Sequence, residues 1–348
     1  PARLHNTQWV GDRSIDFLKR RDHKRPFFLM SSFIRPHPPF ESPTPWNKLY
    51  RAAEMADAHI PDNPEEFRTF WNELQNRYKY RGAWGRDAML IRTIRAAYYS
   101  CISFIDFQIG RVLEALGEEA DNTVILFTAD HGELLGDYGC VGKRTMQEVS
   151  ARVPLIAVWP GVLPAGARSK VPVSLLDVHQ TIVDAAGAGQ ESHPERASLR
   201  DLHGRAEPRV VFSQFSQRRY AQYLASDGRW KYAWSAPDRK EWLVDLENDP
   251  LESRNLADLP EARPHRDRLR QALWDRYTRD GYTDAATAEG WTDHPIPELS
   301  ENPEDDVIFQ DAPNTDERVR SLGPDYYRKV TREHPENIRC LWDIMKNA

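Results

Sequence analysis

The segment from Asp87 to Leu116 constrains the fold of this chain most strongly. Its apolar side chains recur at the three- and four-residue spacing of a helix, and Gly117 follows the last of them. A short polar turn, "DNT", then leads into the strand-length apolar run Val124–Thr128. A long amphipathic helix that leads directly into a buried strand is typical of helices packed on a sheet.

The same alternation of helices and strands continues on both sides of this segment. The spacing of apolar residues predicts further helices over Trp9–Leu18 and about Ser174–Ala186, and further strands over Phe27–Met30 and Val153–Trp159. Strands that alternate with helices of this length predict an α/β fold, with a mainly parallel sheet sandwiched by helices.

The pattern changes after about residue 205. Short strands joined by turns follow, with a hairpin signal at Asp227-Gly228, and then a helix near residues 269–277. This part predicts a small antiparallel sheet with a helix packed on it. We therefore expect three regions, namely residues 1–205 as the α/β domain, 206–280 as the antiparallel subdomain, and 281–348 as an extended tail with a late helix near Tyr326–Met345.

Composition narrows the classes of partner. The 348 residues include 47 basic and 53 acidic ones, a net charge of −6 without a basic stripe, so nucleic acid is not an expected partner. The apolar runs have strand length and are far too short for a membrane span. Three widely spaced cysteines, Cys101, Cys140 and Cys340, form no disulfide framework. The sequence leaves the cellular location undetermined, since exported, periplasmic and cytoplasmic locations are all compatible with this composition.

Polar side chains follow two of the predicted strands. His37 lies in a proline-rich loop after Phe27–Met30, while Asp130 and His131 come directly after Val124–Thr128. An adjacent Asp and His can ligate one divalent cation; the carboxylate suits Ca²⁺ or Mg²⁺, and the imidazole also suits softer metals. Two ligands are too few for a closed site, and an ordinary turn at a strand end is the alternative interpretation.

Two further side chains suit the chemistry of an anion bound beside a metal. Lys143 lies thirteen positions after Asp130 and can place a positive charge where a tetrahedral anion would bind. His37 can donate a proton to a departing oxygen. The alternatives are a solvated surface lysine and a loop histidine that bonds to the backbone.

Cys140 begins the segment "CVGKR", which differs at one position from C-x-[PA]-x-R, the signature that directs the conversion of cysteine to formylglycine. Gly142 stands where the signature requires Pro or Ala, and the segment lies in the loop that supplies Lys143. We therefore interpret Cys140 as a bystander, with a nucleophilic Cys140 as the alternative.

Five segments follow one another along the chain, namely "RPFFLMSSFIRPHPPF", "FIDFQIGRVLEAL", "NTVILFTADHGELLGDYG", "GKRTMQEVSARVPLIAVWPG" and "WLVDLENDPLESRNLA". In this order and spacing they resemble the sulfatases of the alkaline-phosphatase superfamily, in particular the carbohydrate- and choline-sulfatase-like members. The resemblance implies that Asp130 and His131 are metal ligands, usually for Ca²⁺, with Mn²⁺, Mg²⁺ or Zn²⁺ as alternatives. It also implies that Lys143 contacts the sulfate group and the leaving oxygen, and that His37 helps to protonate that oxygen.

The chain departs from the family pattern at its beginning. Sulfatases carry an Asp-Asp metal pair, the formylglycine cysteine and a Lys-x-His element before the "PHPPF" loop, and this sequence contains none of them. We therefore expect a processed or truncated N-terminus, with formylglycine upstream of Pro1 or on a companion chain. The chain by itself is then expected to be inactive, with a gap in its core and an open sheet edge.

The leading hypothesis is the metal-assisted hydrolysis of a sulfate ester, in a sulfated small molecule or carbohydrate. A phosphodiesterase or phosphonate monoester hydrolase of the same superfamily is the first alternative, because tetrahedral phosphoryl and sulfuryl centres need similar contacts. Ca²⁺ with formylglycine favours the sulfatase, and Mn²⁺ or Zn²⁺ favours the phosphoryl enzymes. The second alternative is a non-catalytic remnant of the fold.

Overall fold

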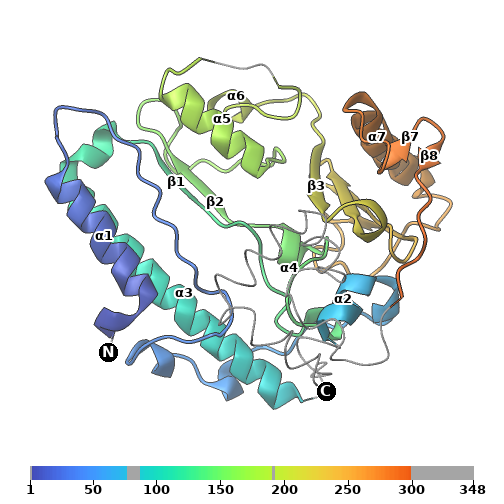
Figure 1. The fold of residues 1–348 in the computed structure, drawn as a ribbon, viewed down its shortest axis with the longest axis horizontal. Coiled ribbons are helices and arrows are strands. Elements are labelled where there is room, and N and C mark those ends of the chain that lie inside the picture. Colours follow the sequence, from blue (N-terminus) through green and yellow to red (C-terminus); the bar gives the residue numbers. More distant parts are fainter. Residues whose placement is uncertain (1, 77–86, 190–192, 299–348) are drawn as a thin grey trace, which may run out of the picture.

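The computed structural model describes residues 2–76, 87–189 and 193–298 (Figure 1). Its α-helices are α1 (Asn6–Arg20), α2 (Phe70–Leu74), α3 (Ala88–Leu116), α4 (Glu148–Ala151), α5 (Leu175–Ala185), α6 (Leu199–Leu202) and α7 (Arg263–Arg279). Its strands are β1 (Ile125–Thr128), β2 (Leu155–Val158), β3 (Val211–Phe215), β4 (Gln222–Ser226), β5 (Trp230–Ser235), β6 (Lys240–Asp245), β7 (Ala286–Thr287) and β8 (Gly290–Trp291).

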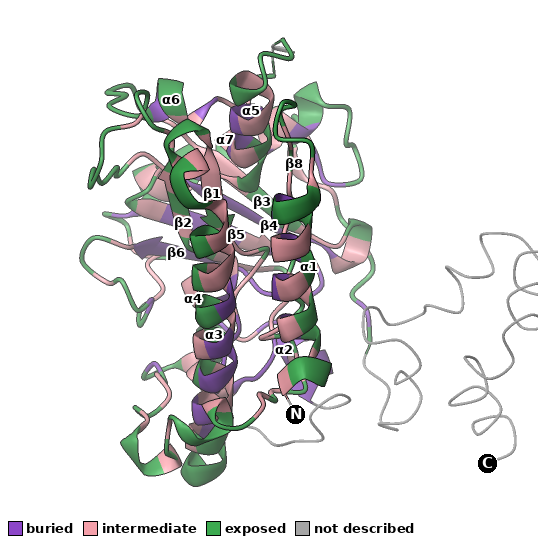
Figure 2. Ribbon diagram, turned by 90° about the vertical axis from the view of Figure 1, so that its left-hand side faces the viewer, coloured by how far each residue is buried: buried purple, intermediate pink, exposed green. Residues whose placement is uncertain are grey.

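Helices α1 and α3 pack side by side along one edge of the molecule (Figure 1). The carboxylate of Asp87 caps α3 by accepting the backbone N–H groups of Met89 and Leu90, at 2.9 and 3.2 Å. In Figure 2 the buried residues of α3 lie on its side toward α1. These two helices and α5 confirm the helices predicted over Trp9–Leu18, Asp87–Leu116 and about Ser174–Ala186.

Strands β1 and β2 pair with each other in the antiparallel direction, with Ile125 opposite Val158 and Thr128 opposite Leu155. Both strands match the predicted positions, whereas the direction of their pairing differs from the parallel one expected. Local apolar patterns locate a strand but do not say which way its neighbour runs. In the part of the chain that the structure describes, every strand pair is antiparallel.

The strand predicted over Phe27–Met30 is wrong for the described structure. The segment lies outside any strand, and its side chains alternate between two environments. Phe27 packs edge-on against Phe17 of α1 and lies under the guanidinium of Arg21, whereas Phe28 and Met30 are 67% and 75% exposed. An apolar run becomes a strand only where a neighbour supplies ladder hydrogen bonds. Within the described ranges no such neighbour lies beside this run.

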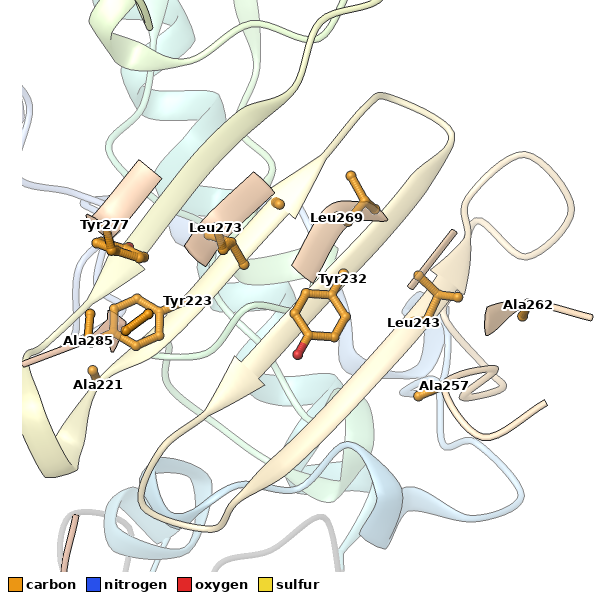
Figure 3. Close-up of a cluster of buried hydrophobic side chains, with 12 residues drawn as sticks. Ala221, Tyr223, Tyr232, Leu243, Ala257, Ala262, Leu269, Leu273, Tyr277 and Ala285 are labelled. Carbon is orange, nitrogen blue, oxygen red and sulfur yellow. The ribbon is translucent and has the colours of Figure 1, made fainter. Parts of the chain in front are cut away.

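A second region contains the antiparallel sheet in the order β3-β4-β5-β6. Asp227 and Gly228 turn the chain between β4 and β5, and Gly228 has a φ of 93°, a conformation that glycine adopts without strain. Helix α7 covers one face of this sheet, as Figure 3 shows. The side chains buried there include Tyr223, Tyr232, Leu243, Leu269, Leu273 and Tyr277. The predicted antiparallel subdomain with its packed helix is confirmed.

The opposite face of the same sheet packs on the loop between β1 and α4. Leu224, Ala233, Trp242 and Val244 point to this side, because side chains alternate along a strand. Their partners from the loop include Leu134, Tyr138, Cys140 and Met146. One hydrophobic core thus crosses the boundary expected near residue 205, and that boundary stays a prediction.

The expected tail begins with β7 and β8, and the late helix predicted near Tyr326–Met345 lies outside the described residues. Among the helices that the structure describes, none combines the length and apolar character needed to cross a membrane.

Candidate functional site

The loop of residues 129–147, here called the site loop, carries three of the four predicted site residues and is held by its own backbone. The N–H of Gly132 donates to the carbonyl of Ser150, that of Leu134 to Gly142, and that of Gly136 to Cys140, each at 2.8 Å. A Cβ atom at Gly132 would lie 2.1 Å from the carbonyl oxygen of Val149, so only glycine permits this approach to α4.

Asp130 and His131 lie together at the end of β1. The Nε2 of His131 is 3.5 Å from an Oδ of Asp130, and the carboxylate is 84% exposed. The Nδ1 of His131 lies 2.8 Å from the carbonyl oxygen of Gly132, a contact that requires a proton on Nδ1. In the neutral ring Nε2 then carries the lone pair that a metal ion would take, and a backbone bond to the other ring nitrogen is the usual support of a metal-binding imidazole.

Tyr98 of α3 lies near the acidic groups that follow β1. Burial, with the negative charges of Glu133 and Asp130 adding to it, raises the pKa of Tyr98 to about 12. The phenol therefore stays protonated across the physiological pH range and can serve there only as a hydroxyl group.

His37 lies in the proline-rich loop, which packs on α3 through Phe40. Its ring is exposed, and its Nδ1 lies 2.8 Å from the carbonyl oxygen of Pro38. The side chain of Arg35, paired with Glu41, donates to the carbonyl oxygen of His37 at 2.8 Å. Phe40 packs edge-on against Tyr98, with ring centroids 5.5 Å apart, so this loop and the acidic groups after β1 meet at the same residue of α3.

Lys143 lies on a separate part of the site loop and is held through its backbone. The side-chain amide of Gln75 bonds to it twice, because Gln75 donates to the carbonyl oxygen of Lys143 and accepts its N–H at 3.2 Å. Gln222 of β4 donates to the carbonyl oxygen of the next residue, Arg144, at 3.0 Å. The sheet and the segment after α2 therefore fix the position of this lysine, whose side chain is half-buried.

Cys140 is fully buried between the site loop and the sheet. Its thiol donates to the carbonyl oxygen of Tyr138 at 3.4 Å, and burial raises its pKa. A buried thiol with a raised pKa is a poor nucleophile. These properties agree with the interpretation of Cys140 as a bystander.

A buried cluster of charges that sequence reasoning did not find lies directly after the site loop. Lys231 of β5 lies 2.9 Å from the carboxylate of Glu148 and forms a second ion pair with Glu252. Lys231 and Glu252 are 1% and 0% exposed. One signal was available, since a lysine between Trp230 and Tyr232 in a predicted strand has to face the opposite side from them. Its partners are distant in sequence and could not be named.

The structure thus brings Asp130 and His131 together and connects them with the His37 loop through Tyr98, while Lys143 is anchored from the sheet side. Among the residues that the structure describes, no group of three or more His, Cys, Asp or Glu side chains could hold a metal ion. Asp130 and His131 fit two positions of a divalent-cation site, with one oxygen and one oriented nitrogen, and further ligands would have to complete it.

Comparison with known proteins identifies relatives of this chain. The chain is 34% identical over 295 residues to an arylsulfatase of Clostridium perfringens, a match that covers 81% of this chain and 60% of the relative. It is 32% identical over 287 residues to a choline-sulfatase of Rhizobium meliloti, covering 78% of this chain and 55% of that protein. The chain therefore spans a little more than half the length of these curated relatives.

Among solved structures, a phosphonate monoester hydrolase from Silicibacter pomeroyi superposes with a TM-score of 0.66 at 24% identity, covering 85% of this chain and 65% of that one. This likeness confirms the predicted α/β fold. The family model for the C-terminal part of N-sulphoglucosamine sulphohydrolase matches residues 136–279, and that for sulfatases matches residues 4–188. The sulfatase model matches more than half of the 348 residues of this chain, and the chain therefore belongs to the sulfatase family.

Proposed function

We propose that this chain supplies part of the active site of a sulfatase, an enzyme that hydrolyses a sulfate ester. The observation that carries the proposal is the Asp130–His131 pair, whose exposed carboxylate and oriented imidazole stand at the end of β1 within the matched family region. The substrate is a sulfated small molecule or a carbohydrate, in keeping with relatives described as an arylsulfatase and a choline-sulfatase.

Each predicted residue has a distinct role in this proposal. Asp130 and His131 hold a divalent cation, with Ca²⁺ first and Mn²⁺, Mg²⁺ or Zn²⁺ as alternatives; when bound, such a cation polarises the sulfate oxygens. Lys143 neutralises negative charge on the sulfuryl group as the ester bond breaks. His37 donates a proton to the leaving oxygen.

The nucleophile in this proposal is a formylglycine upstream of Pro1 or on a companion chain. Cys140 is unsuited to the task because it is buried and its pKa is raised. The first experiment is to determine the intact mass and N-terminal sequence of every polypeptide in the purified active material. A segment that contains C-x-[PA]-x-R with its cysteine converted to the aldehyde supports the proposal, whereas activity from a sample without any such residue contradicts it.

Site variants of the active enzyme test the roles of the individual residues. Lys143→Ala and His37→Ala are each expected to lower kcat toward 4-nitrophenyl sulfate by about 10²- to 10³-fold, while the thermal unfolding midpoint stays close to that of the parent. Lys19→Ala and His23→Ala remove exposed side chains of the same kinds on and beside α1 and serve as matched controls. Full activity of either site variant would refute the role of that residue.

The phosphonate monoester hydrolase neighbour makes a phosphoryl substrate the second candidate. The two candidates are distinguished by comparing kcat/KM for 4-nitrophenyl sulfate with that for a phenylphosphonate monoester, and by metal analysis of the active enzyme. A higher kcat/KM for the phosphonate, with bound Mn²⁺ or Zn²⁺, would favour the second candidate. If neither ester is hydrolysed by material that contains formylglycine, the remaining alternative is a non-catalytic member of the fold.

A further inference from the structure

The buried cluster of Lys231, Glu148 and Glu252 joins the site loop to the antiparallel sheet. Lys231 belongs to β5 and Glu252 follows β6, whereas Glu148 is the first residue of α4, directly after the site loop. The ammonium of Lys231 pairs with both carboxylates. Two carboxylates share one lysine with little access to water, so each member depends on the position of the others.

Glu252 contacts both ends of the segment that carries Lys143. One of its carboxylate oxygens accepts the backbone N–H of Glu148 at 2.5 Å and the hydroxyl of Tyr138 at 3.4 Å. The same hydroxyl lies 3.1 Å from the carbonyl oxygen of Leu251. Tyr138 and Glu148 each lie five residues from Lys143, on opposite sides. A single buried carboxylate thus holds the segment before and after the lysine.

The sheet adds contacts near the middle of this segment. Gln222 of β4 donates to the carbonyl oxygen of Arg144, and Leu134, Tyr138 and Met146 pack on the sheet face opposite to α7. The segment is therefore held by hydrogen bonds to the Glu252 carboxylate at its ends and by apolar contacts with the sheet along its length. A change in the cluster would shift the backbone that carries Lys143.

We propose that Lys231 and Glu252 are positioning residues of the active site: through Tyr138 and Glu148 they fix the backbone of Lys143, so that the antiparallel subdomain takes part in binding the sulfate group. The inference rests on the role of Lys143 in the proposed function and extends it. A group misplaced by about 1 Å can lower a rate by about 10²-fold, so an anchor without substrate contact can still control turnover.

A double-mutant cycle in the active enzyme tests this proposal. Lys231→Met is expected to lower kcat toward 4-nitrophenyl sulfate by about 10²-fold, because it leaves two carboxylates without their shared cation. In an enzyme that already carries Lys143→Ala, the same substitution is expected to lower kcat by no more than about twofold, since Lys231 acts through Lys143. Hydrogen exchange of the active enzyme with Lys231→Met should be faster at residues 138–148 of this chain and unchanged in α1 and α3.

A matched control uses a second buried ion pair among the residues that the structure describes. Arg209 and Asp177 are 9% and 0% exposed and lie 2.6 Å apart, at α5 and away from the site loop. Arg209→Met is expected to lower stability while kcat of the folded protein stays unchanged. If Lys231→Met does not fold, Lys231→Met with Glu252→Gln removes the charges of these two fully buried members and takes its place in the cycle.

The outcomes separate this proposal from the proposed function. If Lys143→Ala lowers kcat strongly and the addition of Lys231→Met lowers it further by as much as in the parent, positioning through Lys143 is refuted. That result would not contradict the role of Lys143 in the proposed sulfatase site. Unchanged kcat in folded Lys231→Met, or in the double variant Lys231→Met with Glu252→Gln, would also refute the positioning proposal. Full activity of Lys143→Ala would refute the role of that lysine and, with it, the positioning proposal.

Discussion

Gly132 shows how one residue can determine the path of the site loop. A methyl group at this position would meet the carbonyl oxygen of Val149 at 2.1 Å, an approach that backbone atoms cannot accommodate without moving. We predict that Gly132→Ala lowers the free energy of unfolding by about 1–3 kcal/mol, measured by urea denaturation. Gly110→Ala is the control, because Gly110 lies in α3 with open space around it, and alanine there should add about 0.5–1 kcal/mol. Equal effects of the two substitutions would contradict this role of Gly132.

At the residue scale, the sequence pattern located the site residues that follow a predicted strand. It could not locate those whose role depends on contacts between distant parts of the chain. Asp130 and His131 could be found because they directly follow an apolar run, and the structure places them at the end of β1. Lys231 and Glu252 could not be paired, because their contact depends on how β5 and the turn after β6 meet in space. The contribution of Tyr98 likewise depends on the packing of α3 beside the acidic groups after β1.

At the scale of elements, one side chain caps the beginning of α3. Asp87 accepts two N–H groups that the first helical turn leaves unpaired, those of Met89 and Leu90. We predict that Asp87→Ala lowers the free energy of unfolding by about 1 kcal/mol in thermal or urea denaturation. Asp87→Asn keeps an acceptor oxygen and should lie within a few tenths of a kcal/mol of the parent. A loss of the same size in both variants would show that the cap contributes little.

Helices were easier to predict than strands because the residues that determine a helix, including its cap, lie close together in the sequence. Helix α3 has its periodicity, its cap at Asp87 and its end at Gly117 within one continuous stretch of sequence. A strand depends on partners from elsewhere, so the run Phe27–Met30 could suggest a strand without any means of showing what would pair with it. The direction of the β1–β2 pair was undetermined on the same ground.

At the scale of the whole molecule, two extended segments present apolar side chains to water. Phe28 and Met30 are 67% and 75% exposed, and Ile156 and Val158 of β2 are 58% and 45% exposed. Such rows are unusual on a protein that functions alone in solution and commonly mark surfaces that another element covers. The relatives that this chain matches are longer, since it spans 60% of one and 55% of another. The longer polypeptides therefore contain enough additional chain to cover these rows.

This argument predicts how the 348-residue chain behaves when purified by itself. It should bind the dye 1-anilinonaphthalene-8-sulfonate with increased fluorescence and should self-associate at micromolar concentration, because the exposed rows offer apolar surface. Met30→Gln with Ile156→Gln should lower both signals. Leu49→Gln, which replaces an apolar residue that is 52% exposed near α3, should change neither. The active enzyme, with any further chain that it contains, should bind less dye than this chain alone. A monomeric chain that binds no more dye than the active enzyme would show that these rows need no cover, and the expectation of an open core would then be wrong.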